Sequence, residues 1–206
     1  KKSLIRWGDG ESTIFAGGNI NFQKNSYLLM YNFWKLVLHY NKNSKYLLAI
    51  PKEVLETRND ELEKAKLWYL TKSIVKIFFN NKMFYLDSMI FREDTELLNE
   101  NIEKLWIKYK NIIFIHNNYK YYIDFKNKYN ESMVHFVSVP SANSFAQSEI
   151  VINKVNQIKN LTEHSTCVLI SAGPSSKYII GKLCNTITCY DMGHYFDYKF
   201  YNISRK

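Results

Sequence analysis

The chain has 206 residues, of which 46% are hydrophobic, a size and composition that suit a single domain with a buried core. The 28 Lys and Arg residues outnumber the 19 Asp and Glu residues, and the formal net charge of +9 favours anionic partners such as nucleotides or an acidic membrane surface. No apolar stretch approaches the length of a membrane span, and neither a basic block nor a recognisable binding module indicates nucleic acid.

Short apolar runs alternate with segments of helical period along the chain. Strands are expected at 4–5, 46–50, 112–115, 134–139, 167–170 and 187–190. Helices are expected at 26–39, 67–78, 97–106, 123–129, 147–159 and 177–183, with Ser26 and Thr95 as candidate N-caps. Residues 83–91 look strand-like or irregular, and the poorly patterned region near 52–94 could be an insert. The pattern predicts an α/β fold in which helices cover both faces of a mainly parallel sheet.

The sequence RWGDGE at residues 6–11 follows the first expected strand. We expect Gly8 and Gly10 to allow a sharp loop that holds Asp9 and Glu11 at the carboxyl end of this strand, where ligands bind in open α/β sheets. Two ionised carboxylates so close together repel each other, so a divalent cation that also binds a diphosphate is their natural partner. An ordinary turn is the alternative, because Gly-Asp-Gly is common turn chemistry.

A second polar turn, at residues 171–176, lies between an expected strand and an expected helix. Gly173 frees the turn, Pro174 suits the first helical positions, and Ser175 or Ser176 can cap the helix. A helix N-terminus with free N–H groups can bind phosphate, although an ordinary strand-to-helix turn explains the pattern equally well.

Asp191 and His194 follow the last expected strand. They could supply a base and a metal ligand, or Asp191 could orient His194, and a purely structural pair is the alternative. Residues 116–118 and 141–145 occupy the corresponding place after two other strands. All of these turns are therefore expected at one edge of the sheet.

Together these segments resemble the GT-D-type glycosyltransferases, a bacterial family that uses nucleotide-sugar donors. The matching segments, in the order and spacing of the family, are RWGDGE (6–11), INFQ (20–23), VPSANSF (139–145), AGPSS (172–176) and YDMGH (190–194). One segment departs from the family: residues 115–120 read IHNNYK, where the family has two acids and glycines. The departure leaves the donor specificity open and makes an inactive member an alternative.

The resemblance implies a Rossmann-like domain over residues 1–206 that moves a sugar, expected to be a hexose, from a UDP-sugar to an acceptor in glycoprotein or polysaccharide assembly. In this reading Asp9 and Glu11 position Mn²⁺ or Mg²⁺ on the donor diphosphate, and Asp191 and His194 face the reacting centre, with Asp191 as the candidate base. The implied donor-binding residues are Arg6, Gly8, Gly10, Phe22, Gln23, Ser141, Asn143, Gly173, Pro174 and Ser175.

The partners and the setting follow from the same interpretation. The acceptor would be a glycan, a glycoprotein or a lipid-linked sugar, nucleic acid is not expected, and a homo-oligomer stays open. The three cysteines lack the spacing of a disulfide framework or a zinc site, which favours a cytoplasmic protein, and the net charge would allow contact with the inner membrane face. The chain opens on Lys1-Lys2 without a methionine, so it could be truncated. A metal-dependent nucleotide-sugar hydrolase and a non-catalytic nucleotide- or glycan-binding module are the alternative functions.

Overall fold

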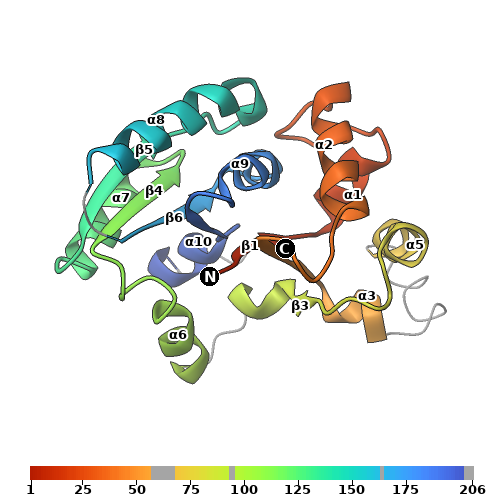
Figure 1. Ribbon diagram of the computed structural model, residues 1–206, viewed down its shortest axis with the longest axis horizontal. Coiled ribbons are helices and arrows are strands. Elements are labelled where there is room, and N and C mark those ends of the chain that lie inside the picture. Colours follow the sequence, from red (N-terminus) through yellow and green to blue (C-terminus); the bar gives the residue numbers. More distant parts are fainter. Residues whose placement is uncertain (57–67, 93–95, 163–164, 202–206) are drawn as a thin grey trace.

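The computed structural model describes residues 1–56, 68–92, 96–162 and 165–201, and its strands form one parallel sheet (Figure 1). The strands are β1 (Ser3–Arg6), β2 (Tyr46–Ile50), β3 (Leu86–Asp87), β4 (Asn111–His116), β5 (Met133–Ser138), β6 (Thr166–Ser171) and β7 (Thr188–Asp191). Their order across the sheet is β3-β2-β1-β7-β6-β4-β5. The strand order therefore reverses next to β1, where an open α/β sheet forms a crevice at its carboxyl edge.

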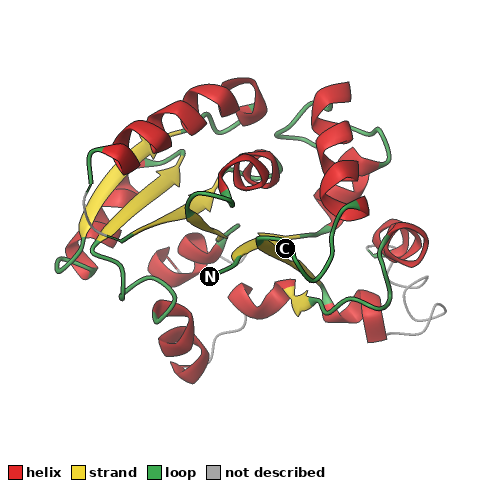
Figure 2. Ribbon diagram, in the orientation of Figure 1, coloured by secondary structure: helices red, strands yellow, loops and turns green. Residues whose placement is uncertain are grey.

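Helices cover both faces of this sheet (Figure 2). The larger core lies under α1 (Asp9–Phe15), α2 (Tyr27–Leu38), α3 (Lys52–Glu56), α5 (Tyr69–Phe78), α8 (Ser148–Asn160) and α9 (Ser175–Leu183). The smaller core lies under α6 (Glu96–Glu103), α7 (Tyr119–Lys128) and α10 (Tyr195–Tyr201). Two short 3₁₀ helices, η1 (Ser88–Arg92) and η2 (Ser144–Gln147), complete the described elements.

The two cores are separated by the alternation of side chains along each strand. In β4, Ile113 and Ile115 belong to the larger core, whereas Ile112 and Phe114 belong to the smaller one. Successive side chains of a strand point to opposite faces, so a strand that is covered on both sides carries apolar residues at consecutive positions along its middle. The expected α/β fold, with helices on both faces of a parallel sheet, is confirmed.

The expected strands are all present, and most expected helices lie within a few residues of their predicted ends. Ser26 caps α2, because its hydroxyl accepts a hydrogen bond from the backbone N–H of Leu29. α7 begins earlier than expected, since Asn118 caps it by accepting a hydrogen bond from the N–H of Lys120. The expected cap at Thr95 lies outside the described residues. α1, α3 and α10 were not expected from the sequence.

The described part of the region 52–94 is built into the domain and is not an insert. β3 pairs in parallel with β2 and forms the edge of the sheet. Ile74 and Val75 of α5 are buried in the larger core. The edge strand has only two residues, which is too short for an alternating pattern to reveal it.

Candidate functional site

Two adjoining cavities lie at the carboxyl edge of the sheet, beside the point where the strand order reverses. The smaller, of about 110 Å³, is lined by residues that follow β1 and β7 and by the first turn of α9. The larger, of about 240 Å³, is lined by residues that follow β4, β5 and β6. Both cavities contact the four residues Phe22, Gly173, Gly193 and His194. The segments singled out in the sequence therefore meet at one place.

The GDGE segment forms the first turn of α1, so the expected loop is wrong. Gly8 is the extended N-cap, and Asp9 and Glu11 lie in the first turn, where the unpaired N–H groups of a helix stabilise negative charge. Residues two apart on a helix do not face each other. Asp9 is exposed whereas Glu11 is half-buried, although both contact the smaller cavity.

Lys177 is the central cation of the smaller cavity. Its ammonium lies 2.7 Å from Oε1 of Glu11 and 2.9 Å from Oδ2 of Asp191. Burial by itself lowers the pKa of Lys177, but the carboxylates of Asp191 and Glu11 together outweigh that effect, so the pKa lies above its ordinary value. The side chain is thus a buried, charged link between α9, α1 and the end of β7.

Sequence reasoning missed Lys177. It directly follows the AGPSS segment and lies in the first turn of α9. A lysine at this end of a helix opposes the helix dipole, so its position calls for nearby carboxylates. This unfavourable placement of a lysine was the signal by which the sequence could have identified Lys177 as part of the site.

Asp191 is 1% exposed, and its two carboxylate oxygens differ in their surroundings. Oδ2 accepts hydrogen bonds from the backbone N–H of Arg6, at 3.2 Å, and from the ammonium of Lys177. Oδ1 is buried and has no hydrogen-bond partner among the residues that the structure describes. A buried carboxylate oxygen without a donor is costly, so a polar ligand in the adjoining cavity would stabilise this arrangement.

Arg6 lies at the base of the smaller cavity and ties β1 to two neighbouring segments. Its Nε donates to the carbonyl of Ser88 at 2.9 Å, and its Nη1 donates to the carbonyl of Met192 at 3.1 Å. The guanidinium also lies over the ring of Phe91, 5.3 Å from the centroid. Arg6 therefore holds β1 to the segments at Ser88 and Met192, in addition to the donor-binding role that the resemblance implied.

The segment INFQ is fastened to the segment that follows β5. The N–H of Asn143 donates to the carbonyl of Phe22, and the side chain of Asn143 accepts from the N–H of Lys24, both at 2.8 Å. Gln23 is buried and accepts a hydrogen bond from the N–H of Phe145. Gln23 and Asn143 thus hold the two loops together.

Phe22 is left 44% exposed at the junction of the two cavities. Gly173 faces it: a Cβ atom on Gly173 would lie 3.1 Å from the ring, and the backbone of Gly173 is left-handed, with φ of +56°. Ser141 is exposed and lines the larger cavity. Phe22 and Ser141 are thus exposed members of the implied donor-binding set that line a cavity.

The prediction that Ser175 or Ser176 caps α9 is wrong, because neither hydroxyl bonds to the free N–H groups at the start of this helix. The hydroxyl of Ser175 donates to the carbonyl of Ala172 at 2.7 Å, and the hydroxyl of Ser176 accepts from the N–H of Ala172. Ser144 also donates to the carbonyl of Ala172, at 3.0 Å. Pro174 takes the N-cap position and makes no side-chain cap. The hydroxyls stabilise the turn itself, because strand, turn and helix are packed too closely to leave them free.

His194 is oriented by Asp197, and not by Asp191 as one interpretation of the sequence had it. Nδ1 of His194 lies 2.9 Å from Oδ2 of Asp197, whose Oδ1 accepts a hydrogen bond from the hydroxyl of Tyr121 at 2.7 Å. The ring of Tyr121 stacks on His116, with 4.5 Å between the ring centroids. Sequence reasoning missed Asp197, and the available signal was its spacing of three residues from His194, in the first turn of a helix that was not predicted.

The comparisons with known proteins agree with this geometry. No curated protein matches the chain. A structure named "A New Glycosyltransferase (DUF1792) from Streptococcus sanguinis" is similar over 100% of this chain and 81% of its own, with a TM-score of 0.77 at 17% sequence identity. Another, named "The highly conserved domain of unknown function 1792 has a distinct glycosyltransferase fold", has a TM-score of 0.77 at 18% identity, over 98% of this chain and 76% of its own.

At such low identity these two structures establish a common fold, and the family follows from a separate comparison of sequences. The family model "Glycosyltransferase GT-D fold" matches residues 4–206, which is nearly the whole chain. The match includes every segment that lines the two cavities. The chain therefore belongs to the GT-D-fold family and is a glycosyltransferase.

Proposed function

We propose that the protein transfers a sugar from a UDP-sugar to a hydroxyl of a glycan, glycoprotein or lipid-linked acceptor, with a divalent cation bound at Asp9 and Glu11. The observation that supports this most directly is the meeting of the two cavities at Gly193 and His194. The smaller cavity holds the charged groups, so it suits the diphosphate. The larger one, lined by loops and aromatic side chains, suits the sugar or the nucleoside.

The residues of the smaller cavity fit a divalent cation that arrives with the donor. Mg²⁺ in nucleotide enzymes usually takes one or two carboxylates and completes its shell with phosphate oxygens and water. Asp9 and Glu11 supply two such carboxylates on the cavity wall. Among the residues that the structure describes, no three His, Cys, Asp or Glu side chains are grouped to hold a metal. When bound, the ion would neutralise charge on the leaving diphosphate as a Lewis acid.

Lys177 has two tasks in this proposal. Its ammonium fixes the carboxylate of Glu11 in the cavity wall, which prepares the site before the donor binds. It also adds a positive charge beside the place of the diphosphate, in a buried setting where such charges act strongly.

We assign the general base of an inverting transfer to His194 and a positioning role to Asp191. A base must reach the acceptor hydroxyl. Asp191 is almost fully buried and held by Lys177, whereas the side chain of His194 is 40% exposed. With Nδ1 of His194 bonded to Asp197, Nε2 is the nitrogen that can take the proton of the acceptor.

Replacing Asp9 by Asn tests the donor site. We expect UDP with Mn²⁺ to raise the melting temperature of the wild-type protein, because a ligand at about 100 times its Kd stabilises the native state by about 2.7 kcal/mol. In Asp9→Asn, which removes one carboxylate from an exposed position without changing its size, this stabilisation should largely disappear. The measurement is a thermal shift with UDP and UDP-sugars, each with and without Mn²⁺.

Glu131→Gln is the control for this experiment, because it removes one exposed carboxylate just before β5, whereas the larger cavity is lined by residues that follow the other end of this strand. It should respond to UDP and Mn²⁺ as the wild-type protein does. An equal shift in Asp9→Asn and the wild type would disprove the assignment of the cation to Asp9. Release of free sugar without an acceptor would instead identify a nucleotide-sugar hydrolase.

Replacing His194 by Asn tests the base. We expect kcat to fall by about 10²–10⁴-fold, the usual contribution of a general base, with the UDP-dependent thermal shift retained. Asp197→Asn should lower kcat less, because it disturbs only the orientation of the imidazole. His39→Asn, an exposed histidine after α2, is the matched control. A wild-type kcat in His194→Asn would exclude His194 as the base.

A further inference from the structure

The carboxylate that holds His194 is itself held on both of its oxygens. Oδ2 of Asp197, on α10, lies 2.9 Å from Nδ1 of His194, and Oδ1 accepts a hydrogen bond of 2.7 Å from the hydroxyl of Tyr121, on α7. Asp197 is 5% exposed and Tyr121 is 7% exposed, so water competes little for these bonds. The side chain that orients His194 therefore depends on a second helix.

Tyr121 is fixed in turn by two neighbouring rings. Its ring stacks on His116, at the end of β4, with an angle of 21° between the ring planes, and its centroid lies 4.7 Å from that of Tyr201 on α10. Nδ1 of His116 accepts a hydrogen bond of 3.0 Å from the N–H of Asn118, the residue that caps α7. The turn after β4, which the sequence placed at this edge of the sheet, thus sets the position of the Tyr121 ring.

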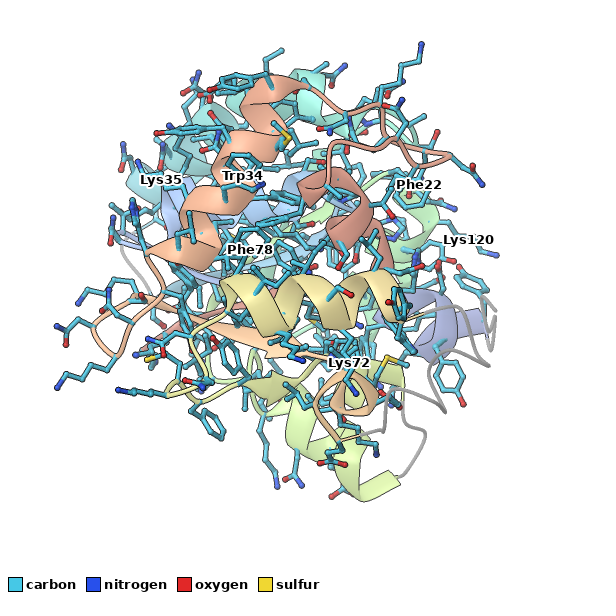
Figure 3. All side chains as sticks on the ribbon, turned by 90° about the vertical axis from the view of Figure 1, so that its right-hand side faces the viewer. Phe22, Trp34, Lys35, Lys72, Phe78 and Lys120 are labelled. Atoms are coloured by element: carbon cyan, nitrogen blue, oxygen red, sulfur yellow. The ribbon has the colours of Figure 1, made fainter. Side chains whose placement is uncertain are left out.

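Tyr121 lies behind the wall of the larger cavity. Asp197 and His194 line this cavity, whereas Tyr121 is not among the described residues that line either cavity of the site. Figure 3 shows Lys120, the residue before Tyr121, on the same side of the molecule as Phe22, which lies at the junction of the two cavities. A ligand in the larger cavity can therefore contact His194 directly, and Tyr121 acts on it through Asp197.

The orientation of Asp197 decides which nitrogen of His194 carries the hydrogen. An ionised carboxylate only accepts hydrogen bonds, so Nδ1 of His194 must donate to it, and Nε2 is left without a hydrogen. The last torsion of an aspartate side chain is broad, so a carboxylate held at one oxygen alone can turn. A second bond, from the hydroxyl of Tyr121, removes this freedom.

We propose that Tyr121 is a positioning residue of the transfer reaction, because it holds the carboxylate of Asp197 in the orientation that keeps Nε2 of His194 ready to take a proton. The consequence for catalysis rests on the proposed role of His194 as the base, whereas the effect on the imidazole does not. A bond that merely joins α7 to α10 is the alternative. Such a bond would contribute to stability and would leave the hydrogen of His194 where it is.

Tyr121→Phe tests the effect on the imidazole, because it removes the hydroxyl and keeps the ring that stacks on His116. The ¹⁵N NMR shifts of the histidine rings report whether Nδ1 or Nε2 carries the hydrogen, and they are measured on the full chain at about pH 9, well above the ordinary pKa of histidine. The spectrum of His194→Asn identifies the signals of His194. The shifts of its two nitrogens should lie far apart in the wild type and should move toward each other in Tyr121→Phe.

The kinetic effect of Tyr121→Phe should fall on kcat. Loss of one hydrogen bond of ordinary net strength should lower kcat by about 2–10-fold. The KM for the donor and the UDP-dependent thermal shift should stay as in the wild type, because Tyr121 does not line the donor site. In the His194→Asn background the same change should lower kcat no further, since Tyr121 acts through His194.

Tyr122→Phe is the matched control, because it removes a hydroxyl from the next residue of the same helix. This hydroxyl donates to the carbonyl of Val134 at 3.4 Å, near the start of β5, whereas the larger cavity is lined by residues that follow the other end of this strand. Tyr122→Phe should keep the wild-type kcat and the wild-type ring shifts of His194. Circular dichroism and melting temperature would show that both variants are folded.

Two results would overturn the proposal. The first is a set of His194 ring shifts in Tyr121→Phe that equals that of the wild type. The second is a fall in kcat that is as large in the His194→Asn background as in the wild-type background, which would leave Tyr121 a structural role alone. A wild-type kcat in His194→Asn, together with altered ring shifts in Tyr121→Phe, would instead reject His194 as the base and support its positioning by Tyr121.

Discussion

Replacing Lys177 by Met is expected to destabilise the protein by about 3–5 kcal/mol, the usual cost of removing one partner from a buried ion pair. The methionine fills most of the same space, so the loss comes from charge and not from a cavity. Without the ammonium, the carboxylates of Glu11 and Asp191 would lie beside each other in a buried setting. Thermal and urea unfolding at neutral pH would measure the change.

The dependence of stability on alkaline pH gives a second test of the ion pairs that Lys177 makes with Glu11 and Asp191. The pKa of Lys177 is raised above its ordinary value of 10.5. A group whose pKa is higher in the folded state stabilises that state fully below its unfolded pKa and loses this contribution as the pH rises through the folded value. The difference in stability between the wild type and Lys177→Met should therefore begin to shrink only above about pH 10.5.

Two further variants separate charge from general damage to α9. Lys182→Met, five positions along the same helix and exposed, should lose about 1 kcal/mol or less. Adding Glu11→Gln and Asp191→Asn to Lys177→Met should restore much of the lost stability, because the unpaired charges are gone, but it should not restore UDP binding. A Lys177→Met protein that unfolds like the wild type would show that the buried ion pair is not a determinant of stability.

Replacing Gly193 by Ala is expected to cost at least about 3 kcal/mol and to abolish donor binding. The backbone at Gly193 is left-handed, with φ of +53°, which strains any side chain. A Cβ atom would also lie 2.0 Å from Nη1 of Arg6, so the guanidinium would have to move. That movement would break the hydrogen bonds from Arg6 to Ser88 and Met192 at the base of the smaller cavity.

Gly17→Ala is the matched control for this change. Its φ is +92°, and a Cβ atom there would meet nothing within 4 Å, so only the backbone strain remains. The loss should be about 1–2 kcal/mol, with UDP binding intact. The two costs are compared by urea unfolding, and UDP binding by thermal shift. Equal losses at Gly193 and Gly17 would show that the contact with Arg6 contributes nothing.

The sequence by itself determined the layers of this protein. A strand such as β4, which is covered on both faces, has an unbroken apolar run at 112–115, and this continuous pattern is visible without any knowledge of the fold. Helical periods and local caps are equally local: Ser26 and α2 lie within one turn of each other. The order of the motifs was enough to identify the family resemblance, because it depends only on residue types and their spacing along the chain.

The local structure of two motifs could be settled only by the fold. GDGE is compatible with a loop or with a first helical turn, and packing of Ile14 and Phe15 in the larger core favours the helix. The hydroxyl of Ser175 could cap α9 or bond within its turn, and the carbonyl of Ala172 lies close enough to take it. In both cases tertiary contacts choose between local conformations of similar energy.

The chemistry of the site was decided entirely by tertiary structure. Lys177 meets Glu11 across more than 160 positions of the chain, and this contact exists because β7 inserts beside β1 in the sheet. Asp191 and Asp197 lie equally far from His194 along the chain, three positions before and three positions after it, yet the helical turn of α10 brings Asp197 to His194 and leaves Asp191 to Lys177. Sequence spacing carries no record of strand order or burial, and these two properties determine which charges pair.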